Sequence, residues 1–294
     1  MSKIHLLVID AQWDFCHEGD PNYDPANPNP DPMIDFVKRP GALPVQGAQE
    51  DCIRAAEMIR KGIKKIDDIS VTMDSHRPLH IAHADFWRDD QGNMPTPFAD
   101  IITTADITGK NRKWHTYNPA FQEWAEKVYC PGLEKRGRNA LCIWPKHCIW
   151  GTQGWALYPC VQEAIQEWCE KEQAIVNVCF KGQNVRTEWY SAVAAEIEDP
   201  KDPQTALNTD FVETFRDADL FVFLGQALSH CMLWTFMDIV DYLGEKFVKK
   251  CLLIEDATSP VPLPPCVQAS DEFLRKYKSM GMQTCTAAEF VSDV

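Results

Sequence analysis

Short apolar runs, rich in β-branched residues, recur along the chain and are separated by long polar or mixed stretches. The apolar positions within each run are nearly continuous rather than alternating, which is typical of strands buried on both faces of a parallel sheet. We therefore expect these runs to form a mainly parallel central sheet. The runs are Ile4–Ile9, Ile66–Met73, Ala174–Phe180, Leu220–Leu224 and Cys251–Ile254.

Helical periodicity appears in the stretches between these runs. The apolar residues of Gln46–Lys61 fall toward one face of a helix: Cys52, Ile53, Ala56 and Ile59. Alternation of strands with helices predicts a single α/β domain over residues 1–294, a three-layer α/β/α arrangement in which helices cover both faces of the sheet. The same periodicity predicts three other helices: Tyr158–Glu170, Cys231–Tyr242 and Pro265–Lys278.

Two long segments interrupt this alternation. Residues 19–45 begin with Gly19–Pro40, which is dense in Pro, Asn and Asp and is expected to form an extended loop. Residues 84–143 are rich in Trp, Gly and Pro, with a short helix expected around Pro119–Val128. Long insertions in compact domains are usually lids, binding loops or disordered spacers, and the aromatic content favours ordered covers here. Three tryptophans are interpreted as packing within a lid: Trp87, Trp114 and Trp124.

The charge balance and the apolar pattern exclude several classes of partner. The 294-residue chain has a net charge of −14, whereas binding of nucleic-acid phosphates requires clustered Lys and Arg. Its apolar runs are far too short to span a bilayer, and strand-like sequence begins at Ile4 with no signal-peptide core before it. The 12 cysteines are spread widely with no Cys-x-x-Cys pair, which favours reduced thiols. We expect a cytoplasmic protein that binds neither nucleic acid nor membranes.

Chemically useful side chains follow three of the expected strands. Asp10 follows the first run, Lys181 the third, and Cys231 lies beyond the fourth at the start of a helix. Ligands of open α/β sheets bind at the carboxyl ends of the strands, so these side chains are expected to converge. The helix N-terminus and Lys181 would favour the thiolate of Cys231, and Asp10 could accept a proton. In isolation each residue has a plainer interpretation: a turn cap, a solvated lysine and an inert buried thiol.

A second group of side chains contains one carboxylate and two imidazoles. Asp74 and His76 follow the second expected strand, and His147 lies in the segment 144–148. Three such ligands leave coordination positions open, which is typical of a catalytic rather than a structural site for a divalent metal. Zinc, iron(II) and manganese(II) all accept this kind of ligand set. The plainer alternative is that the Asp-x-His pair occurs by chance and that each histidine is an ordinary packed residue.

Several motifs follow one another along the chain: Ile9–Phe15, Asp74–His76, Trp144–Thr152, Lys181-Gly182 with Glu188–Ala192, and Gly225–Cys231. In this order they resemble the nicotinamidase family of isochorismatase-like cysteine hydrolases, over nearly the whole chain apart from the two insertions. The resemblance implies an isochorismatase-like fold and a metal-dependent nicotinamidase of NAD salvage. Such an enzyme hydrolyses nicotinamide to nicotinic acid and ammonia.

The resemblance implies a role for each matching catalytic residue. Cys231 would be the nucleophile that forms a thioester, Asp10 the carboxylate that handles protons, and Lys181 the cation beside them. In this family the residue four before the cysteine follows a cis peptide bond, which here is the Gln226–Ala227 bond. The N–H groups of Ala227 and Cys231 would then form the oxyanion hole.

The same resemblance implies one divalent metal ion, zinc in first place with iron and manganese as alternatives. Asp74, His76 and His147 would bind it, and it would face the ring nitrogen of nicotinamide. His80 is a candidate fourth ligand or supporting residue, and His83 is close enough in sequence to compete. Three aromatic residues match positions that wall the pyridine ring: Phe15, Trp144 and Tyr190.

Two other functions remain open from the sequence. Other amidases of the superfamily act on different small amides or ureides, although they generally lack the metal-binding trio. The second insertion lies beside the expected pocket. It therefore leaves the identity of the natural substrate less defined than the type of reaction. The alternative of a different class is a catalytically silent protein that binds pyridine ligands, and the intact Asp10, Lys181 and Cys231 argue against it. A small amide is the expected partner, and a homo-oligomer remains open.

Overall fold

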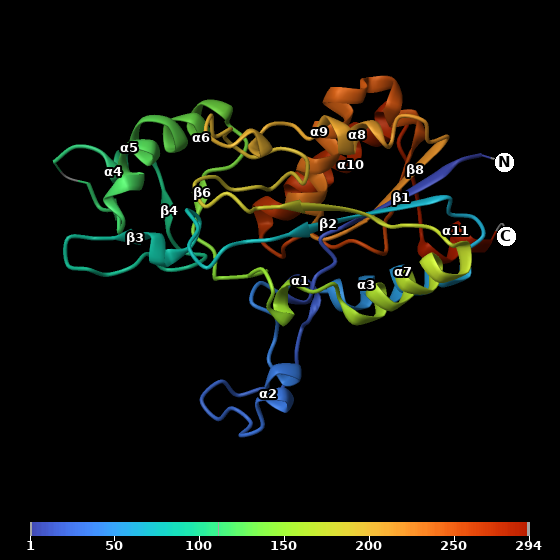
Figure 1. Cartoon of the computed structure of the whole chain (residues 1–294), viewed down its shortest axis with the longest axis horizontal. Coiled ribbons are helices and arrows are strands. Elements are labelled where there is room, and N and C mark those ends of the chain that lie inside the picture. The colour runs from blue at the N-terminus through green and yellow to red at the C-terminus, as the bar shows by residue number, and fades with distance from the viewer. Residues whose placement is uncertain (1, 111, 293–294) are drawn as a thin grey trace.

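A parallel sheet forms the centre of the molecule (Figure 1). The computed structural model describes residues 2–110 and 112–292, and in this part of the chain six strands pair in parallel in the order β10–β9–β8–β1–β2–β7. The arrangement confirms the predicted fold class. The strands are β1 (Ile4–Ile9), β2 (Asp68–Asp74), β7 (Asn177–Lys181), β8 (Leu220–Gly225), β9 (Cys251–Ile254) and β10 (Gln283–Cys285).

Helices cover both faces of this sheet. One face carries α3 (Ala48–Lys61), α7 (Pro159–Glu172) and α11 (Ala287–Ser292), and the other carries α8 (Thr209–Glu213), α9 (Leu233–Leu243) and α10 (Pro264–Met280). Strand β1 shows why two layers are needed, because successive side chains point to opposite faces of a strand. Leu6 and Val8 belong to the core with α3 and α7, whereas Leu7 and Ile9 belong to the core with α9 and α10.

The predicted strands and helices agree with the structure to within a few residues, but two burial predictions are wrong. Val178 and Phe180 of β7 are 37% and 46% exposed, although this run was expected to be buried on both faces. The strand lies at the edge of the sheet, and these two side chains are only partly covered. Ile53 was assigned to the buried face of α3 and is 38% exposed. The short elements β10 and α11 carry too little apolar pattern to be predicted.

The first insertion contains a helix that the sequence analysis did not predict. Pro32–Lys38 forms α2, after a short α1 (Trp13–Cys16) that follows β1. Asp31 caps α2 by accepting a hydrogen bond from the Met33 N–H, and a proline occupies the first helical position, both of which favour helix initiation. The prediction of an extended loop over Gly19–Pro40 is therefore wrong for this stretch. Helix α2 projects from the body of the molecule (Figure 1).

The second insertion forms a unit with its own apolar core. Trp87 and Trp114 are 0% and 4% exposed inside it, which confirms their predicted packing. Trp124 lies at the margin of this core, and its indole N–H donates to Arg186 O at 2.8 Å. The helix expected around Pro119–Val128 is present and continues into α6. The elements are β3 (Trp87–Arg88), β4 (Ile101–Ile102), α4 (Thr104–Ile107), β5 (His115–Thr116), α5 (Gln122–Trp124), α6 (Cys130–Arg136) and β6 (Leu141–Cys142).

Short 3₁₀ and π-helical segments complete the secondary structure of the described residues. All 12 cysteines are free thiols, as expected. Among the residues that the structure describes, no helix has both the length and the apolar character needed to cross a membrane. The short segments are η1 (Ala84–Phe86), η2 (Pro119–Phe121), η3 (Ala125–Tyr129), η4 (Gln153–Trp155), η5 (Pro203–Thr205), η6 (Leu228–Met232) and η7 (Glu245–Lys250).

Candidate active site and metal centre

The carboxyl ends of neighbouring strands bring the predicted catalytic residues together. Asp10 follows β1, Asp74 ends β2, Lys181 ends β7 and Cys231 lies just beyond β8. The Lys181 ammonium lies 3.1 Å from Asp10 Oδ2 and 3.3 Å from Asp74 Oδ1, and it donates a hydrogen bond to Trp189 O at 2.9 Å. All three charged side chains are buried. A buried cation thus joins the carboxylate of the predicted catalytic group to that of the predicted metal site.

Backbone geometry at the strand ends allows this convergence. Asp10 has a φ of +45°, and its N–H donates to Thr72 O at 3.2 Å while Thr72 Oγ1 donates to Asp10 Oδ1 at 2.6 Å. Gly182 has a φ of +77°, and a Cβ at this position would lie 2.5 Å from Asp74 Oδ1. Glycine therefore lets the chain turn directly after Lys181 without displacing the Asp74 carboxylate.

The charges in this cluster shift one another's pKa values. Burial alone would lower the pKa of Lys181, but Asp10 and Asp74 outweigh burial and raise the pKa well above its usual value. Burial alone would raise the pKa of Asp74, but His76 and Lys181 hold it well below its usual range. The pKa of Asp10 is raised, because burial outweighs the nearby Lys181. Asp10 is therefore the more basic carboxylate and the better proton acceptor.

Cys231 lies in η6, the π-helical turn that leads from β8 into α9. Burial raises the pKa of the Cys231 thiol well above its usual value, and Lys181 opposes this shift only in part. Lys181 therefore lowers the thiol pKa, as expected, but burial, which the sequence does not show, has the larger effect. A dry environment disfavours the charged form of a thiol more strongly than the nearby cation favours it. The thiol needs a base beside it, and Asp10 interacts directly with it.

The backbone before Cys231 has the conformation that the resemblance implied. The Gln226–Ala227 peptide bond is cis. Ala227 lines the same pocket as Cys231, and its N–H donates no hydrogen bond to any residue within 2–110 and 112–292. A free N–H next to the thiol is compatible with the predicted oxyanion hole.

The three predicted metal ligands face one another, and two of them, Asp74 and His147, line the pocket beside Cys231. Asp74 Oδ2 lies 3.0 Å from His76 Nε2 and 3.5 Å from His147 Nε2. With its proton on Nδ1, His147 donates to Pro145 O at 2.8 Å, so the lone pair of Nε2 is directed toward Asp74. Neither ring nitrogen of His76 completes a hydrogen bond in the described chain, and Asp74 Oδ1 has only its ion pair with Lys181. Buried polar atoms are normally satisfied, so this donor set fits a divalent metal ion.

His80 is held by hydrogen bonds within the protein. Its ring centre lies 4.3 Å from that of His76. Its Nε2 donates to Thr187 O at 3.1 Å, and its Nδ1 accepts from the Ala82 N–H at 3.3 Å. Burial and the neighbouring His76 hold its pKa well below the usual value. Because both ring nitrogens are already engaged, His80 is suited to support the cluster rather than to bind a metal.

His83 is the fourth imidazole of the cluster and differs from His80. It is fully buried, with its ring centre 5.3 Å from that of His76 and 5.8 Å from that of His147. Pro78 approaches the ring, but neither ring nitrogen completes a hydrogen bond with the part of the chain that is described. Burial lowers its pKa to about 2, so the ring is neutral and has a free lone pair. His83 is therefore better placed than His80 to be a metal ligand.

Two residues for which no role was predicted, Gln12 and Glu188, support this cluster. Glu188 Oε1 lies 3.8 Å from His76 Nε2, and its Oε2 lies 3.9 Å from His80 Nδ1. The Gln12 amide donates to Asp74 O at 2.8 Å and accepts from the Asp74 N–H at 2.7 Å, which fixes the backbone of this predicted ligand. Both residues lie inside motifs on which the family resemblance rests, and this position in the sequence could have identified them as candidates.

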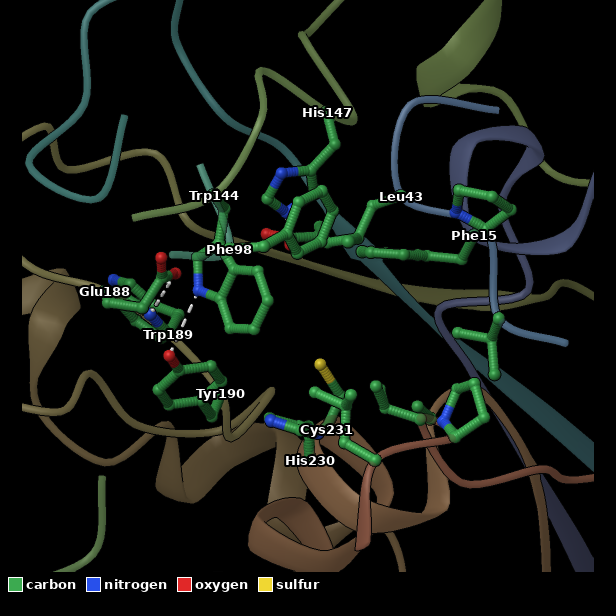
Figure 2. A pocket seen from close by; sticks show the side chains of 17 residues that line it. Phe15, Leu43, Phe98, Trp144, His147, Glu188, Trp189, Tyr190, His230 and Cys231 are labelled. Carbon is green, nitrogen blue, oxygen red and sulfur yellow. Dashed lines mark hydrogen bonds and ion pairs between the residues drawn. The ribbon is translucent and has the colours of Figure 1, made fainter. Parts of the chain in front are cut away.

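A pocket of about 360 Å³ opens beside the thiol. Figure 2 shows the Cys231 sulfur pointing into the space that the aromatic rings surround. The predicted ring-binding residues Phe15, Trp144 and Tyr190 all line it. The Trp144 indole donates to the Tyr190 hydroxyl at 3.1 Å, and the Phe15 ring centre lies 5.3 Å from that of His147. The structure therefore brings the predicted nucleophile, the aromatic residues and two of the predicted metal ligands, Asp74 and His147, to one cavity.

The fold is similar to that of solved nicotinamidases. The yeast nicotinamidase aligns with a TM-score of 0.57 at 17% identity, over 96% of this chain and 98% of that chain. A nicotinamidase/pyrazinamidase from Acinetobacter baumanii aligns with a TM-score of 0.57 at 18% identity, over 98% of both chains. The pyrazinamidase of Pyrococcus horikoshii, solved in complex with zinc, aligns with a TM-score of 0.50 at 18% identity, over 97% of this chain and 99% of that one. No protein-family model matches the chain, and no curated protein sequence matches it. At these identities the similarity establishes a shared fold.

Proposed function

We propose that this protein is a metal-dependent cysteine amidohydrolase that converts nicotinamide to nicotinic acid and ammonia. The observation that carries the proposal is the continuous buried cluster from Cys231 through Asp10 and Lys181 to Asp74, next to an aromatic pocket. The shared fold supports it, and two proteins of this fold have been solved with pyridine ligands. These are the yeast nicotinamidase with the inhibitor nicotinaldehyde and a protein from L. infantum with nicotinate.

The proposed reaction is a two-step acyl transfer. Asp10 takes the proton of Cys231, and the sulfur attacks the carboxamide carbon to form a C–S bond. The N–H groups of Ala227 and Cys231 hold the oxyanion, the C–N bond then breaks, and ammonia leaves with the proton from Asp10. A water molecule gives a proton to Asp10 and attacks the thioester, which releases nicotinic acid and restores the thiol. Lys181 stabilises the negative charge that alternates between Asp10 and Cys231.

Asp74, His76 and His147 would hold the metal in this proposal, with zinc in first place and iron or manganese as alternatives. His76 also forms a second candidate ligand group with His80 and His83, and His83 is the candidate additional ligand because both of its ring nitrogens lack a hydrogen-bond partner in the described chain. A bound divalent metal supplies a Lewis-acid contact for the ring nitrogen of the substrate. The aromatic residues around the pocket would orient the ring so that the carboxamide carbon faces the Cys231 sulfur.

The first test is ammonia release from nicotinamide by the purified protein. We expect activity that disappears on removal of the metal with a chelator and returns when Zn²⁺, Fe²⁺ or Mn²⁺ is added back, with the metal content measured at each stage. Benzamide is the matched control substrate because it has the same carboxamide and lacks the ring nitrogen, so its kcat/KM should be at least about tenfold lower. No ammonia from the metal-loaded protein would contradict the proposed substrate. Full activity without metal would contradict the metal-dependent part of the proposal.

Replacing His83 and His80 separately with alanine should distinguish a metal ligand from a supporting residue. We expect His83→Ala to weaken metal binding by roughly 100-fold, because it removes a lone pair that the protein leaves unused. His80→Ala should weaken binding by less than about tenfold, because its ring nitrogens already bond to Thr187 and Ala82. Zn²⁺ titration by calorimetry, supported by the visible spectrum of the Co²⁺-substituted protein, would measure both. A larger loss in the His80 variant would reverse the assignment.

A further inference from the structure

The pocket beside Cys231 is divided into a polar inner end and an apolar mouth. The inner end contains the thiol, Asp74, His147 and Glu188. The mouth is formed by Leu43–Val45 from the first insertion, Phe98 from the second insertion, and the segment 261–263 between β9 and α10. None of these mouth residues carries a polar or charged side chain. The other lining side chains with polar atoms, Trp144, Trp189, Tyr190 and His230, lie outside these mouth segments, so no side chain of the mouth itself offers a hydrogen bond or a charge.

Phe98 is the most unusual residue of this mouth. It is 59% exposed although it is a large apolar side chain, and it has a φ of +66°. A positive φ is a genuine outlier for a bulky residue, and such conformations persist where the surroundings enforce them, often at ligand sites. Here the Phe98 N–H donates to Ile143 O at 2.8 Å, and its ring meets the Trp144 ring edge-on at 5.9 Å between centres. The chain thus holds an exposed phenyl ring over the pocket (Figure 2).

Leu263 provides a second exposed apolar side chain at the same mouth. It is 53% exposed and ends the segment that leads into α10. This segment is attached to the turn that carries the nucleophile, because the Val261 N–H donates to Ser229 Oγ at 3.1 Å and the Leu228 N–H donates to Ser259 O at 2.9 Å. Phe98 and Leu263 therefore belong to segments that are fixed at the mouth in the free protein.

The volume of the pocket exceeds what a single pyridine ring with one carboxamide requires. At about 360 Å³ it falls in the range of about 300–1,000 Å³ that holds drug-sized ligands. Resting on the proposed function, we infer that the pocket selects aromatic carboxamides whose ring carries an apolar substituent. The substituent lies between Phe98 and Leu263, while the carboxamide reaches Cys231. Burial of that substituent removes apolar surface from water on both sides, which favours binding of the extended substrate.

The test compares nicotinamide with a derivative that carries a propyl group on the ring carbon meta to the carboxamide, using the metal-loaded enzyme. We expect kcat/KM for the propyl derivative to exceed that for nicotinamide by about tenfold. Phe98→Ala and Leu263→Ser should each lower this ratio of kcat/KM values by about tenfold, mainly through the KM of the propyl derivative. Tyr117→Ala is the matched control, because Tyr117 is an exposed aromatic residue of the same insertion that lies against Arg88 and does not line this pocket. It should leave the ratio unchanged.

The outcomes separate this inference from the proposed function. If nicotinamide is hydrolysed and the propyl derivative is the poorer substrate, the inference is overturned and the proposed function stands. A ratio that falls equally in Tyr117→Ala would also overturn it. If neither amide is hydrolysed, the binding of both amides to the Cys231→Ala protein, measured by calorimetry, tests the inference separately from the function. Tighter binding of the propyl derivative that is lost in the Cys231→Ala/Phe98→Ala double variant would support the inference and reject the function. Equal or weaker binding would reject both.

Discussion

Cys231→Ala is expected to lower the rate of nicotinamide hydrolysis by roughly 10,000-fold or more, because it removes the only atom proposed to form a covalent bond to the substrate. The pocket and the metal-binding residues should be unaffected, since the change removes one largely buried sulfur atom and is expected to cost about 1 kcal/mol of stability. Ammonia release under single-turnover conditions, with metal content and thermal unfolding measured in parallel, would test this.

Replacement of a second cysteine, Cys160, serves as the control for the Cys231→Ala variant. Cys160 is a partly exposed thiol on α7, on the opposite side of the domain core from the turn that carries Cys231, and Cys160→Ala should retain full activity. Substantial hydrolysis by the Cys231→Ala protein would remove the acyl-transfer mechanism. Loss of metal or of cooperative unfolding in that variant would mean that the effect is structural, and Cys231→Ser would then be the variant to measure.

The central sheet could be predicted from the sequence because its strands are buried and continuous. The bounds of β1 and β9 agree with the predicted runs Ile4–Ile9 and Cys251–Ile254, both of which lie inside the sheet. The predictions from apolar runs were wrong for elements that are not buried on both faces. The edge strand β7 exposes Phe180, and α2 depends on its cap at Asp31 rather than on apolar periodicity. Local capping chemistry was visible in the sequence, but the dense prolines around it favoured a loop.

The residues of the candidate site that lie at the carboxyl ends of strands could be predicted from the sequence. Asp10, Asp74 and Lys181 are adjacent because parallel strands place successive carboxyl ends side by side. The spacing of His80 and His83 could not decide between them, because the answer depends on which ring nitrogens the surrounding loops engage. Nothing in the sequence indicated that Phe98 lines the pocket, because its position there depends on the fold of the second insertion.

The structure adds burial to what the sequence indicates about the predicted nucleophile. Lys181 lowers the pKa of the Cys231 thiol, as expected, but burial raises it by more. Burial also raises the pKa of Asp10, which makes this carboxylate a better proton acceptor than an exposed one. In the proposed reaction, the thiol therefore transfers its proton to Asp10 at the moment of attack. Asp10 would then deliver that proton to the departing ammonia.

This coupling predicts opposite changes in two reactions when Asp10 is replaced by asparagine. Hydrolysis of nicotinamide should fall by about 100- to 10,000-fold, because no group remains to return a proton to ammonia. Alkylation of Cys231 by iodoacetamide near neutral pH should become several-fold faster. The negative charge of Asp10 raises the pKa of this thiol, and its removal leaves Lys181, which lowers the thiol pKa. The pH at which alkylation reaches half its maximal rate should therefore shift downward.

The geometry around Asp10 makes this variant interpretable. Asparagine has the same shape, its oxygen can take the place of Asp10 Oδ2 and accept from Lys181, and its NH2 group can donate to Thr72 Oγ1. Lys181 keeps Asp74 as a charged partner. The Asp10→Asn/Cys231→Ala double variant should show no fast alkylation, which assigns the reaction to Cys231. Slower alkylation in Asp10→Asn would mean that Asp10 generates the thiolate already in the free enzyme, contrary to the raised thiol pKa. Faster alkylation together with unchanged amide hydrolysis would exclude Asp10 as the proton donor to the leaving group.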